Sequence, residues 1–330
     1  MNNTTKSAAE IHKGDLPVLC LSETQVEALL DPEQLIEALE HGFIAMSQGK
    51  VQSPDRPEIS VPDKGFSLAM PAWMPGMNIS VKVVNVYEGN LDLDLPNHLA
   101  TITLYDPDTG RLLCVMDGTY ITAMRTAASA IVSVKALARD DANVATIIGA
   151  GVQGREHLKL LPLVRRFDAI RIASLRYADA EKLASQHPKA TPVRDIEEAV
   201  RSSDVICLST HSYEPVIQAD WVPVGAHVSS VGYAPPAGEL PIELARDSSL
   251  FVETLDASSP PPVGCGELAG LKPDKSTELG DVLSGARDGR VSDRQITVYK
   301  AMGVAMEDMV AANIAYRQAL RAKVGRTIEL

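Results

Sequence analysis

Apolar residues recur with both helical and strand spacing in the first 118 residues of this 330-residue chain. The short apolar run from Val18 to Leu21 predicts a strand. Helices are expected to start after Ser22 and Asp31, because both residue types cap helices and Pro32 suits a first helical position. Runs punctuated by prolines between residues 51 and 118 predict antiparallel strands. This part is therefore predicted to be an α+β unit.

The spacing changes after a long Ala-rich helix predicted over residues 119–138. From residue 144 to 252, short β-branched runs alternate with helical stretches, which is typical of a doubly wound parallel sheet. The predicted fold class is α/β, with a Rossmann-type domain over residues 126–299. Residues 1–125, together with about 300–330, are assigned to a second, α+β domain.

The last long helix is expected from Ile296 to about Ala322. Its apolar residues fall at helical spacing, namely Val304, Met309, Ile314 and Leu320. We expect this helix to leave the Rossmann-type domain and to pack against the first domain.

A glycine-rich turn follows the apolar run Val144–Ile148 and precedes a helical pattern. Gly149 permits a tight turn, Gly151 allows the backbone to approach a pyrophosphate, and Gly154 allows close packing of strand and helix. The helix start offers free N–H groups to phosphates. The candidate dinucleotide-binding residues of this segment are Gly149, Ala150, Gly151, Val152, Gln153 and Gly154. A plain strand–helix turn without a ligand is the alternative.

Composition narrows the class of partner. The net charge is −12 and the isoelectric point is near 5.1, which argues against nucleic acid or an anionic membrane as the main partner. The four cysteines form no CxxC pair, and the histidines are not spaced as metal ligands, so no metal site is predicted. No signal peptide or membrane-spanning run is visible, and a soluble, cytoplasmic protein is expected.

The segment from Met116 to Ala128, MDGTYITAMRTAA, resembles the ornithine cyclodeaminase/mu-crystallin family, and the resemblance extends over nearly the whole chain. Further matching motifs begin at Val81, Leu104, Gly149, Trp221, Gly266, Glu278 and Gly289. The resemblance implies a homodimer whose second domain serves dimerisation and substrate binding. Family activities include cyclodeamination of ornithine and lysine, alanine dehydrogenation, and reduction of imines.

Three basic residues match family positions that hold the substrate carboxylate. Arg125 lies in the RTAA motif, and its planar guanidinium suits a carboxylate. Lys82 lies inside an apolar strand, where a charged lysine is unfavourable unless it has a function. The resemblance implies that it binds the substrate carboxylate or donates a proton. Arg56 matches a basic position in a proline-rich loop. The alternatives are a solvated or interface Arg125 and a Lys82 that faces solvent.

Two departures from the family pattern bear on the substrate. The segment from Val231 to Leu240 lacks the aspartate that cyclodeaminases carry there, and it is one residue shorter. This puts cyclodeamination in doubt. Leu68 stands where some relatives have an arginine, so the pocket is expected to be more apolar.

The ribose of the cofactor is expected about twenty residues after the glycines. Ser174 occupies the position where an acidic residue would select NAD, and Arg176 lies close by. This favours NADP(H), with NAD(H) as the alternative. Thr210 and His211 follow a strand that is expected to pass near the nicotinamide.

We therefore interpret the chain as an NAD(P)H-dependent reductase of imines that carry a carboxylate. Lys82 and Arg125 are the candidate catalytic residues, and Arg56 joins them in substrate binding. The alternatives are an amino-acid dehydrogenase, an ornithine cyclodeaminase with bound NAD, and a nucleotide-binding protein without turnover.

Overall fold

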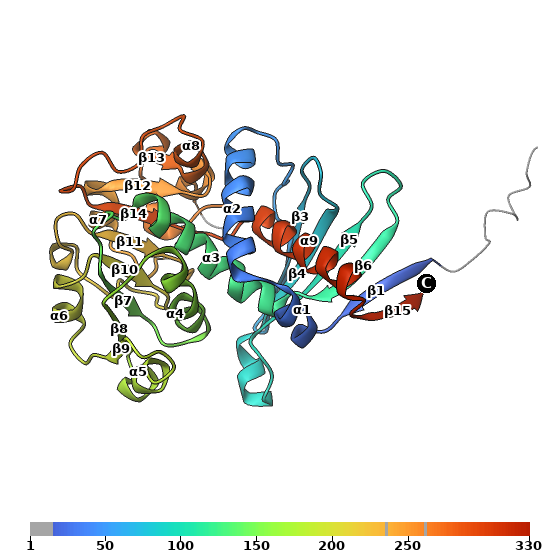
Figure 1. Ribbon diagram of the computed structural model, residues 1–330, viewed down its shortest axis with the longest axis horizontal. Coiled ribbons are helices and arrows are strands. Elements are labelled where there is room, and N and C mark those ends of the chain that lie inside the picture. The colour runs from blue at the N-terminus through green and yellow to red at the C-terminus, as the bar shows by residue number, and fades with distance from the viewer. Residues whose placement is uncertain (1–15, 235–236, 261–262) are drawn as a thin grey trace, which may run out of the picture.

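The computed structural model describes residues 16–234, 237–260 and 263–330, and these residues form two sheets. A mixed sheet occupies one half of the molecule and a parallel sheet the other, with helix α3 (Thr119–Leu137) running between them (Figure 1). The polar segment before residue 16 lies outside the described residues. Within them, no helix combines the length and apolar character needed to cross a bilayer.

The mixed sheet has seven strands in the order β15-β1-β6-β5-β4-β3-β2. The strands are β1 (Pro17–Leu21), β2 (Glu58–Val61), β3 (Gly65–Ala72), β4 (Ile79–Val86), β5 (His98–Tyr105), β6 (Leu112–Asp117) and β15 (Arg326–Glu329). The expected antiparallel arrangement holds from β2 to β6. The predicted strand β1, for which no direction was expected, pairs with β6 in parallel. The chain leaves β1 through two helices before it returns, and a long crossover permits parallel pairing.

Helices α1 (Glu23–Leu29), α3 and α9 (Ala305–Ala322) cover one face of the mixed sheet, and α2 (Pro32–Ser47) packs on α3 and α9. Both predicted caps are confirmed. Ser22 and Gln25 exchange hydrogen bonds in a capping box, and the Asp31 side chain accepts from the Gln34 amide at 2.8 Å. These caps satisfy amides that the helix itself leaves unpaired.

The parallel sheet confirms the predicted doubly wound α/β class. Its eight strands run in the order β13-β12-β14-β11-β10-β7-β8-β9. The strands are β7 (Val144–Ile148), β8 (Ala169–Ala173), β9 (Ala190–Pro192), β10 (Val205–Leu208), β11 (His227–Ser230), β12 (Ser249–Val252), β13 (Ser276–Glu278) and β14 (Thr297–Lys300). The order reverses between β7 and β10, and such a switch point forms a ligand crevice at the carboxyl ends of the strands.

Shorter helices connect these strands. They are α4 (Val152–Val164), α5 (Tyr177–Ala184), α6 (Ile196–Arg201), α7 (Ile242–Asp247) and α8 (Leu279–Leu283). Five short 3-10 helices complete the described elements: η2 (Glu88–Leu93), η3 (Ala219–Trp221), η4 (Leu255–Ser258), η5 (Gly266–Leu268) and η6 (Pro273–Lys275).

The helix expected from Ile296 to Ala322 is wrong over its first part. Residues 297–300 form β14, which lies between β11 and β12 and is buried throughout. A strand buried on both faces shows no alternation of polar and apolar residues, so its spacing resembles that of a buried helix. The helix α9 begins at Ala305, and Leu320 on it is 56% exposed instead of facing the core.

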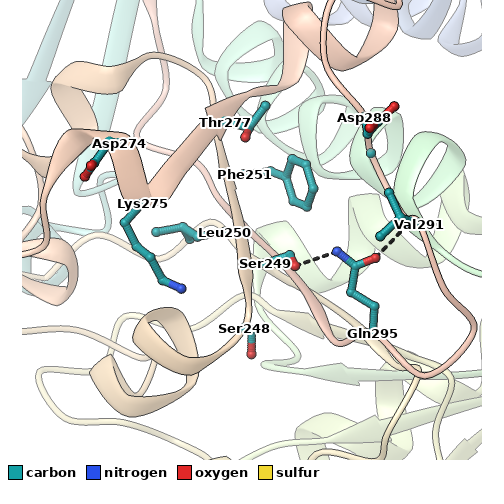
Figure 2. A pocket seen from close by; sticks show the side chains of 11 residues that line it. Ser248, Ser249, Leu250, Phe251, Asp274, Lys275, Thr277, Asp288, Val291 and Gln295 are labelled. Carbon is teal, nitrogen blue, oxygen red and sulfur yellow. Dashed lines mark hydrogen bonds between the residues drawn. The ribbon is translucent and has the colours of Figure 1, made fainter.

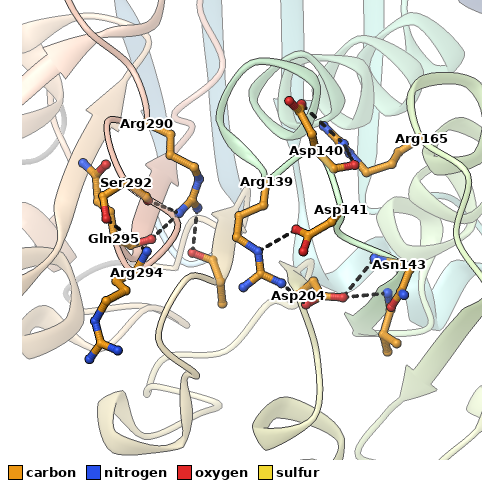
Figure 3. A network of polar contacts seen from close by, with 12 residues as sticks. Arg139, Asp140, Asp141, Asn143, Arg165, Asp204, Arg290, Ser292, Arg294 and Gln295 are labelled. Atoms are coloured by element: carbon orange, nitrogen blue, oxygen red, sulfur yellow. Dashed lines mark hydrogen bonds and ion pairs between the residues drawn. The ribbon is translucent and has the colours of Figure 1, made fainter.

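Ion pairs and hydrogen bonds close the amino-terminal edge of the parallel sheet (Figure 3). Arg139 bonds Asp141 at 2.9 Å and Asp204 at 2.8 Å. The other oxygen of Asp204 accepts from the amides of Asn143 and Val144 at 2.9 and 3.0 Å. This edge is thus tied together by side chains, while the opposite, carboxyl edge stays available for a ligand.

His227 lies fully buried at the start of β11 and bonds Ser133 and Thr297. Burial, together with the positive charges of Arg290 and Arg165, lowers the pKa of His227 to about 3. An unfolded histidine has a pKa of about 6.5. Below that pH the unfolded chain takes up a proton that the folded chain does not, so stability falls as the pH drops from 6.5 toward 3.

We expect His227 to remove about 2 kcal/mol of unfolding free energy between pH 7 and pH 5. His227→Gln lacks the titrating ring, so its stability should fall less than that of the wild type over this range by about that amount. Urea unfolding of both proteins at the two pH values measures the difference. An equal loss in the two proteins would contradict the assignment.

Candidate functional site

The glycine turn between β7 and α4 has the geometry that a dinucleotide requires. Gly149 has φ +111°, and a Cβ there would collide with the carbonyl oxygen of Ser209. A Cβ on Gly154 would collide with the carbonyl oxygen of Gly149, whereas Gly151 faces open space. Helix α4 begins without a side-chain cap, so its first amides are free for phosphate oxygens. The residues present therefore fit a bound dinucleotide.

The other candidates in this turn differ in exposure. Ala150 is half-buried and Val152 is exposed. Gln153 is half-buried, and its side-chain amide donates to the carbonyl of Ala123 in α3 at 3.3 Å. Because α3 also carries Arg125, this contact ties the turn to the helix that holds the carboxylate candidate.

The two ribose candidates lie just after β8. Ser174 is half-buried at the strand end, and the Arg176 side chain is 79% exposed. Nε of Arg176 bonds Asp179 at 2.7 Å. No carboxylate stands at position 174, and a guanidinium lies within two residues of it.

Thr210 and His211 follow β10, as predicted. Both the amide and the hydroxyl of Thr210 donate to the Glu239 carboxylate, at 2.6 and 2.7 Å. His211 is half-exposed, and its Nε2 lies 3.9 Å from Glu88 in η2 of the other half of the molecule. The loop after β10 therefore adjoins the insertion between β4 and β5.

Lys82 and Arg125 meet in one buried cluster, with Asp308 between them. Nζ of Lys82 in β4 lies 2.9 Å from Oδ1 of Asp308 in α9. Nε of Arg125 in α3 lies 3.0 Å from the same oxygen, and its Nη1 lies 2.6 Å from Glu307. Lys82 is 1% exposed and Arg125 5%. Neither side chain is solvated at the surface, so that alternative is wrong for both.

Burial and the neighbouring carboxylates shift the pKa values of Lys82 and Arg125 in opposite directions. Burial lowers the pKa of Lys82 to about 8, against the opposing effect of Asp308. Burial alone would lower the pKa of Arg125, but the carboxylates of Asp308 and Glu307 outweigh it and raise that pKa. Burial and the neighbouring Glu253 together raise the pKa of Glu307 well above its usual range. The cluster sets two cations, Lys82 and Arg125, beside three carboxyl groups, Asp308, Glu307 and Glu253.

Sequence reasoning missed the acidic members of this cluster. Glu253, at the end of β12, is 1% exposed and accepts from the amides of Met302 and Gly303 at 2.8 and 3.1 Å. Glu307 and Asp308 are fully buried in the first turn of α9. A signal was present, because two adjacent acidic residues inside an apolar segment are unfavourable unless they are paired.

The structure does not join Arg56 to this cluster by any contact. Arg56 is half-buried and makes no ion pair within the described part of the chain. It lies near Tyr233 in the loop after β11: burial raises the pKa of Tyr233, and the charge of Arg56 opposes the rise. Arg56 thus adjoins the loop in which the cyclodeaminase aspartate is missing.

A cavity of about 380 Å³ lies elsewhere, at the amino-terminal ends of β12 and β13. Its walls include Ser249, Phe251, Lys275 and Gln295, and Gln295 bonds Ser249 across it (Figure 2). It contains none of the predicted site residues and lies at the edge opposite the crevice. The chemistry assembled at Lys82 and Arg125 therefore identifies the candidate site better than this cavity does.

Comparison with known proteins matches this geometry to a family. The model of the ornithine cyclodeaminase/mu-crystallin family matches residues 17–323. This chain belongs to that family. The family resemblance expected from the RTAA segment and the glycine turn is thereby confirmed.

Three members of the family illustrate the range of relatives. Mouse ketimine reductase mu-crystallin is 34% identical over 307 residues, covering 91% of this chain and 96% of that protein. The structure of Thermococcus litoralis Δ1-pyrroline-2-carboxylate reductase with NADH and L-proline has a TM-score of 0.87 at 34% identity, covering 94% of this chain and 100% of that one. An archaeal alanine dehydrogenase dimer with bound NAD has a TM-score of 0.86 at 30% identity, covering 96% and 100%.

We expect Gly151→Ala to weaken nucleotide binding at least tenfold without lowering the melting temperature. The added methyl group has no protein atom within 4 Å, but it stands where the backbone must approach the pyrophosphate. Calorimetric titration with NADPH and NADH, beside a thermal melt, measures both effects. Gly89→Ala, which also places its methyl in open space, serves as the control. Unchanged affinity in Gly151→Ala would exclude this turn as the phosphate site.

Proposed function

We propose that this protein is an NADP(H)-dependent reductase of imines that bear a carboxylate. The observation that carries the proposal is the buried ionic cluster of Lys82, Arg125 and Asp308 in a chain with an intact dinucleotide turn. The similarity to ketimine reductase and pyrroline-2-carboxylate reductase supports it. When bound, the dinucleotide supplies the hydride.

Arg125 is proposed to bind the substrate carboxylate. Its Nε and Nη1 are fixed by Asp308 and Glu307, while Nη2 donates to no acceptor within the described residues. A guanidinium held on one side by carboxylates is oriented before the substrate arrives, which reduces the entropy lost on binding.

Lys82 is proposed to hold and deliver a proton at the imine nitrogen. Asp308 takes one of its three N–H donors, and the others bond no acceptor in the part of the chain that the structure describes, so the substrate can take them. With a pKa of about 8, this ammonium is a stronger acid than an ordinary lysine. Once Lys82 has passed its proton to the nitrogen, the carboxylate-bearing iminium carries no net charge and can accept the hydride.

Two alternatives are less well supported by the site. Cyclodeamination needs a carboxylate to place the side-chain amine, and residues 231–234 and 237–240 supply only Glu239, which is buried in hydrogen bonds to backbone and hydroxyl groups. An amino-acid dehydrogenase acting on a 2-oxo acid and ammonia would use the same two basic residues. It is distinguished by whether a preformed imine or ammonia is the better substrate.

We further propose that the protein is cytoplasmic and works as a homodimer, with residues 1–125 and 300–330 forming the substrate and dimer domain. The archaeal alanine dehydrogenase is a dimer. In this chain the helices cover one face of the mixed sheet, and the other face exposes Ile59 by 69%, Val83 by 39% and Leu99 by 38%. Apolar side chains exposed on an uncovered sheet face favour association, and Ser67 and Asn85 lie between Ile59 and Leu99 in the register. The four cysteines are unpaired, as in a reducing compartment.

The preference for NADP(H) rests on Ser174 and Arg176. We expect Arg176→Gln to raise the KM for NADPH about tenfold and to leave the KM for NADH within twofold, because only the 2′-phosphate needs the guanidinium. Initial rates with either nucleotide measure this, and Arg194→Gln, on a nearby arginine stacked on Tyr177, is the control. Equal effects on the two nucleotides would contradict the preference.

Arg125→Ala is expected to lower kcat/KM for imine-dependent NADPH oxidation at least a thousandfold. The variant loses the contact to the substrate carboxylate and one of the two cations that pair with Asp308. Arg125→Lys keeps the positive charge but lacks the planar N–H donors of the guanidinium, so it should recover only part of the rate. The assay uses cyclic ketimines, and pyruvate or glyoxylate with amines, beside a test for ammonia release from ornithine. Proline and ammonia from ornithine without net nucleotide turnover would overturn the reductase.

A further inference from the structure

A second buried ionic group lies at the carboxyl edge of the parallel sheet, and we call Glu239, Glu267 and Lys300 the edge cluster. Nζ of Lys300 lies 2.9 Å from Oε1 of Glu267. It also donates to the hydroxyl of Ser230 at 3.2 Å and to the carbonyl of Gly232. Lys300 and Glu239 are fully buried, and Glu267 is 4% exposed.

Glu239 is held as a carboxylate by hydrogen bonds alone. One oxygen accepts from the amide and hydroxyl of Thr210, and the other from Ser230 at 2.9 Å and the Gly232 amide at 2.7 Å. No lysine or arginine of the described chain forms an ion pair with it, so the edge cluster sets two carboxylates against one ammonium.

The ionisable neighbours of the edge cluster do not cancel this charge. Burial raises the pKa of the thiols of Cys207 and Cys265 to about 12. Burial lowers the pKa of the His157 ring, which is neutral at pH 7. The cluster around Lys82 and Arg125 sets three carboxyl groups against two cations, so it offers no excess positive charge. Arg56 and Glu58 act on Tyr233 together with Glu267, and their own charges are opposite. One negative charge of the edge cluster is therefore left uncompensated in the interior.

The edge cluster lies at the nicotinamide end of the crevice. Its contacts run to the first residues after β10 and β11 and to the last residue of β14. These strands lie on the side of the switch point away from β8, whose end reads the adenosine ribose. A dinucleotide lying across the switch point, with its phosphates at Gly149–Gly154, places its nicotinamide half over these strands.

We propose that the edge cluster tunes the bound nucleotide toward its oxidised form and so favours reduction of the imine. This inference rests on the proposed function. Hydride transfer moves two electrons and a proton to the imine carbon, a proton from Lys82 completes the amine, and the nicotinamide ring gains one positive charge. A nearby buried anion stabilises that positive ring and not the neutral reduced one.

Glu267→Gln tests the charge with little change in shape. Oε1 of Glu267 holds Lys300, whereas Oε2 is buried without a hydrogen-bond partner, so an amide can keep the first contact and fill the second position. The substitution leaves one carboxylate against one ammonium. We expect the ratio of Kd for oxidised nucleotide to Kd for reduced nucleotide to rise on the order of tenfold. Calorimetric titration with NADP+, NADPH, NAD+ and NADH measures this ratio without turnover.

The double variant Glu267→Gln with Lys300→Met restores a single negative charge, and its ratio should return toward the wild-type value. Lys300→Met alone removes the ammonium, so the ratio of Kd for oxidised to Kd for reduced nucleotide should fall. If a thermal melt shows that one of the variants folds poorly, another variant still tests the charge. A purely structural role predicts equal loss of affinity for both redox forms. A constant ratio in a folded Glu267→Gln that still binds nucleotide would overturn this inference and leave the reductase intact. Wild-type protein that binds neither redox form would overturn both.

Discussion

The carboxylate of Asp308 organises the candidate site, because one of its oxygens meets two cations from different parts of the chain. Lys82 comes from the mixed sheet and Arg125 from the helix between the two halves. An isolated ammonium or guanidinium in this interior would be strongly unfavourable, so each cation depends on Asp308 being present. The two ion pairs of Asp308 with Lys82 and Arg125 therefore hold β4, α3 and α9 together. The same contacts orient the ammonium and the guanidinium.

The two buried clusters have complementary electrostatic characters. The cluster around Asp308 pairs two cations with carboxyl groups and leaves N–H donors for a carboxylate-bearing substrate, while the edge cluster keeps an excess negative charge near the other reactant. Both rely on a dry interior, where a unit charge acts over several ångströms with little screening. Hydrogen bonds from backbone amides hold Glu239 and Glu253 in place. These side chains therefore need not rearrange when the charge of the reactants changes.

The sequence predicted the local features well and the long-range ones poorly. Caps at Ser22 and Asp31, the glycine turn and the alternation of strands and helices each depend on a few neighbouring residues. Lys82 and Arg125 were found because a charge in an apolar run, or in a recognised motif, is conspicuous. Asp308 was missed because its partner Lys82 is 226 positions away, and only tertiary packing brings the two together. The strand β14 was missed because burial on both faces removes the alternation that identifies a strand.

Helix α3 makes polar contacts along most of its length, and this has a mechanical consequence. Ser129 bonds Tyr299, Ser133 bonds His227, and the carbonyl of Leu137 accepts from Arg290. A helix of 19 residues spans roughly 28 Å, so α3 connects the closed edge of the parallel sheet to Arg125 as one stiff rod. A displacement at either end of the rod is transmitted to the other with little loss, and the guanidinium keeps its place relative to the sheet while neighbouring loops fluctuate.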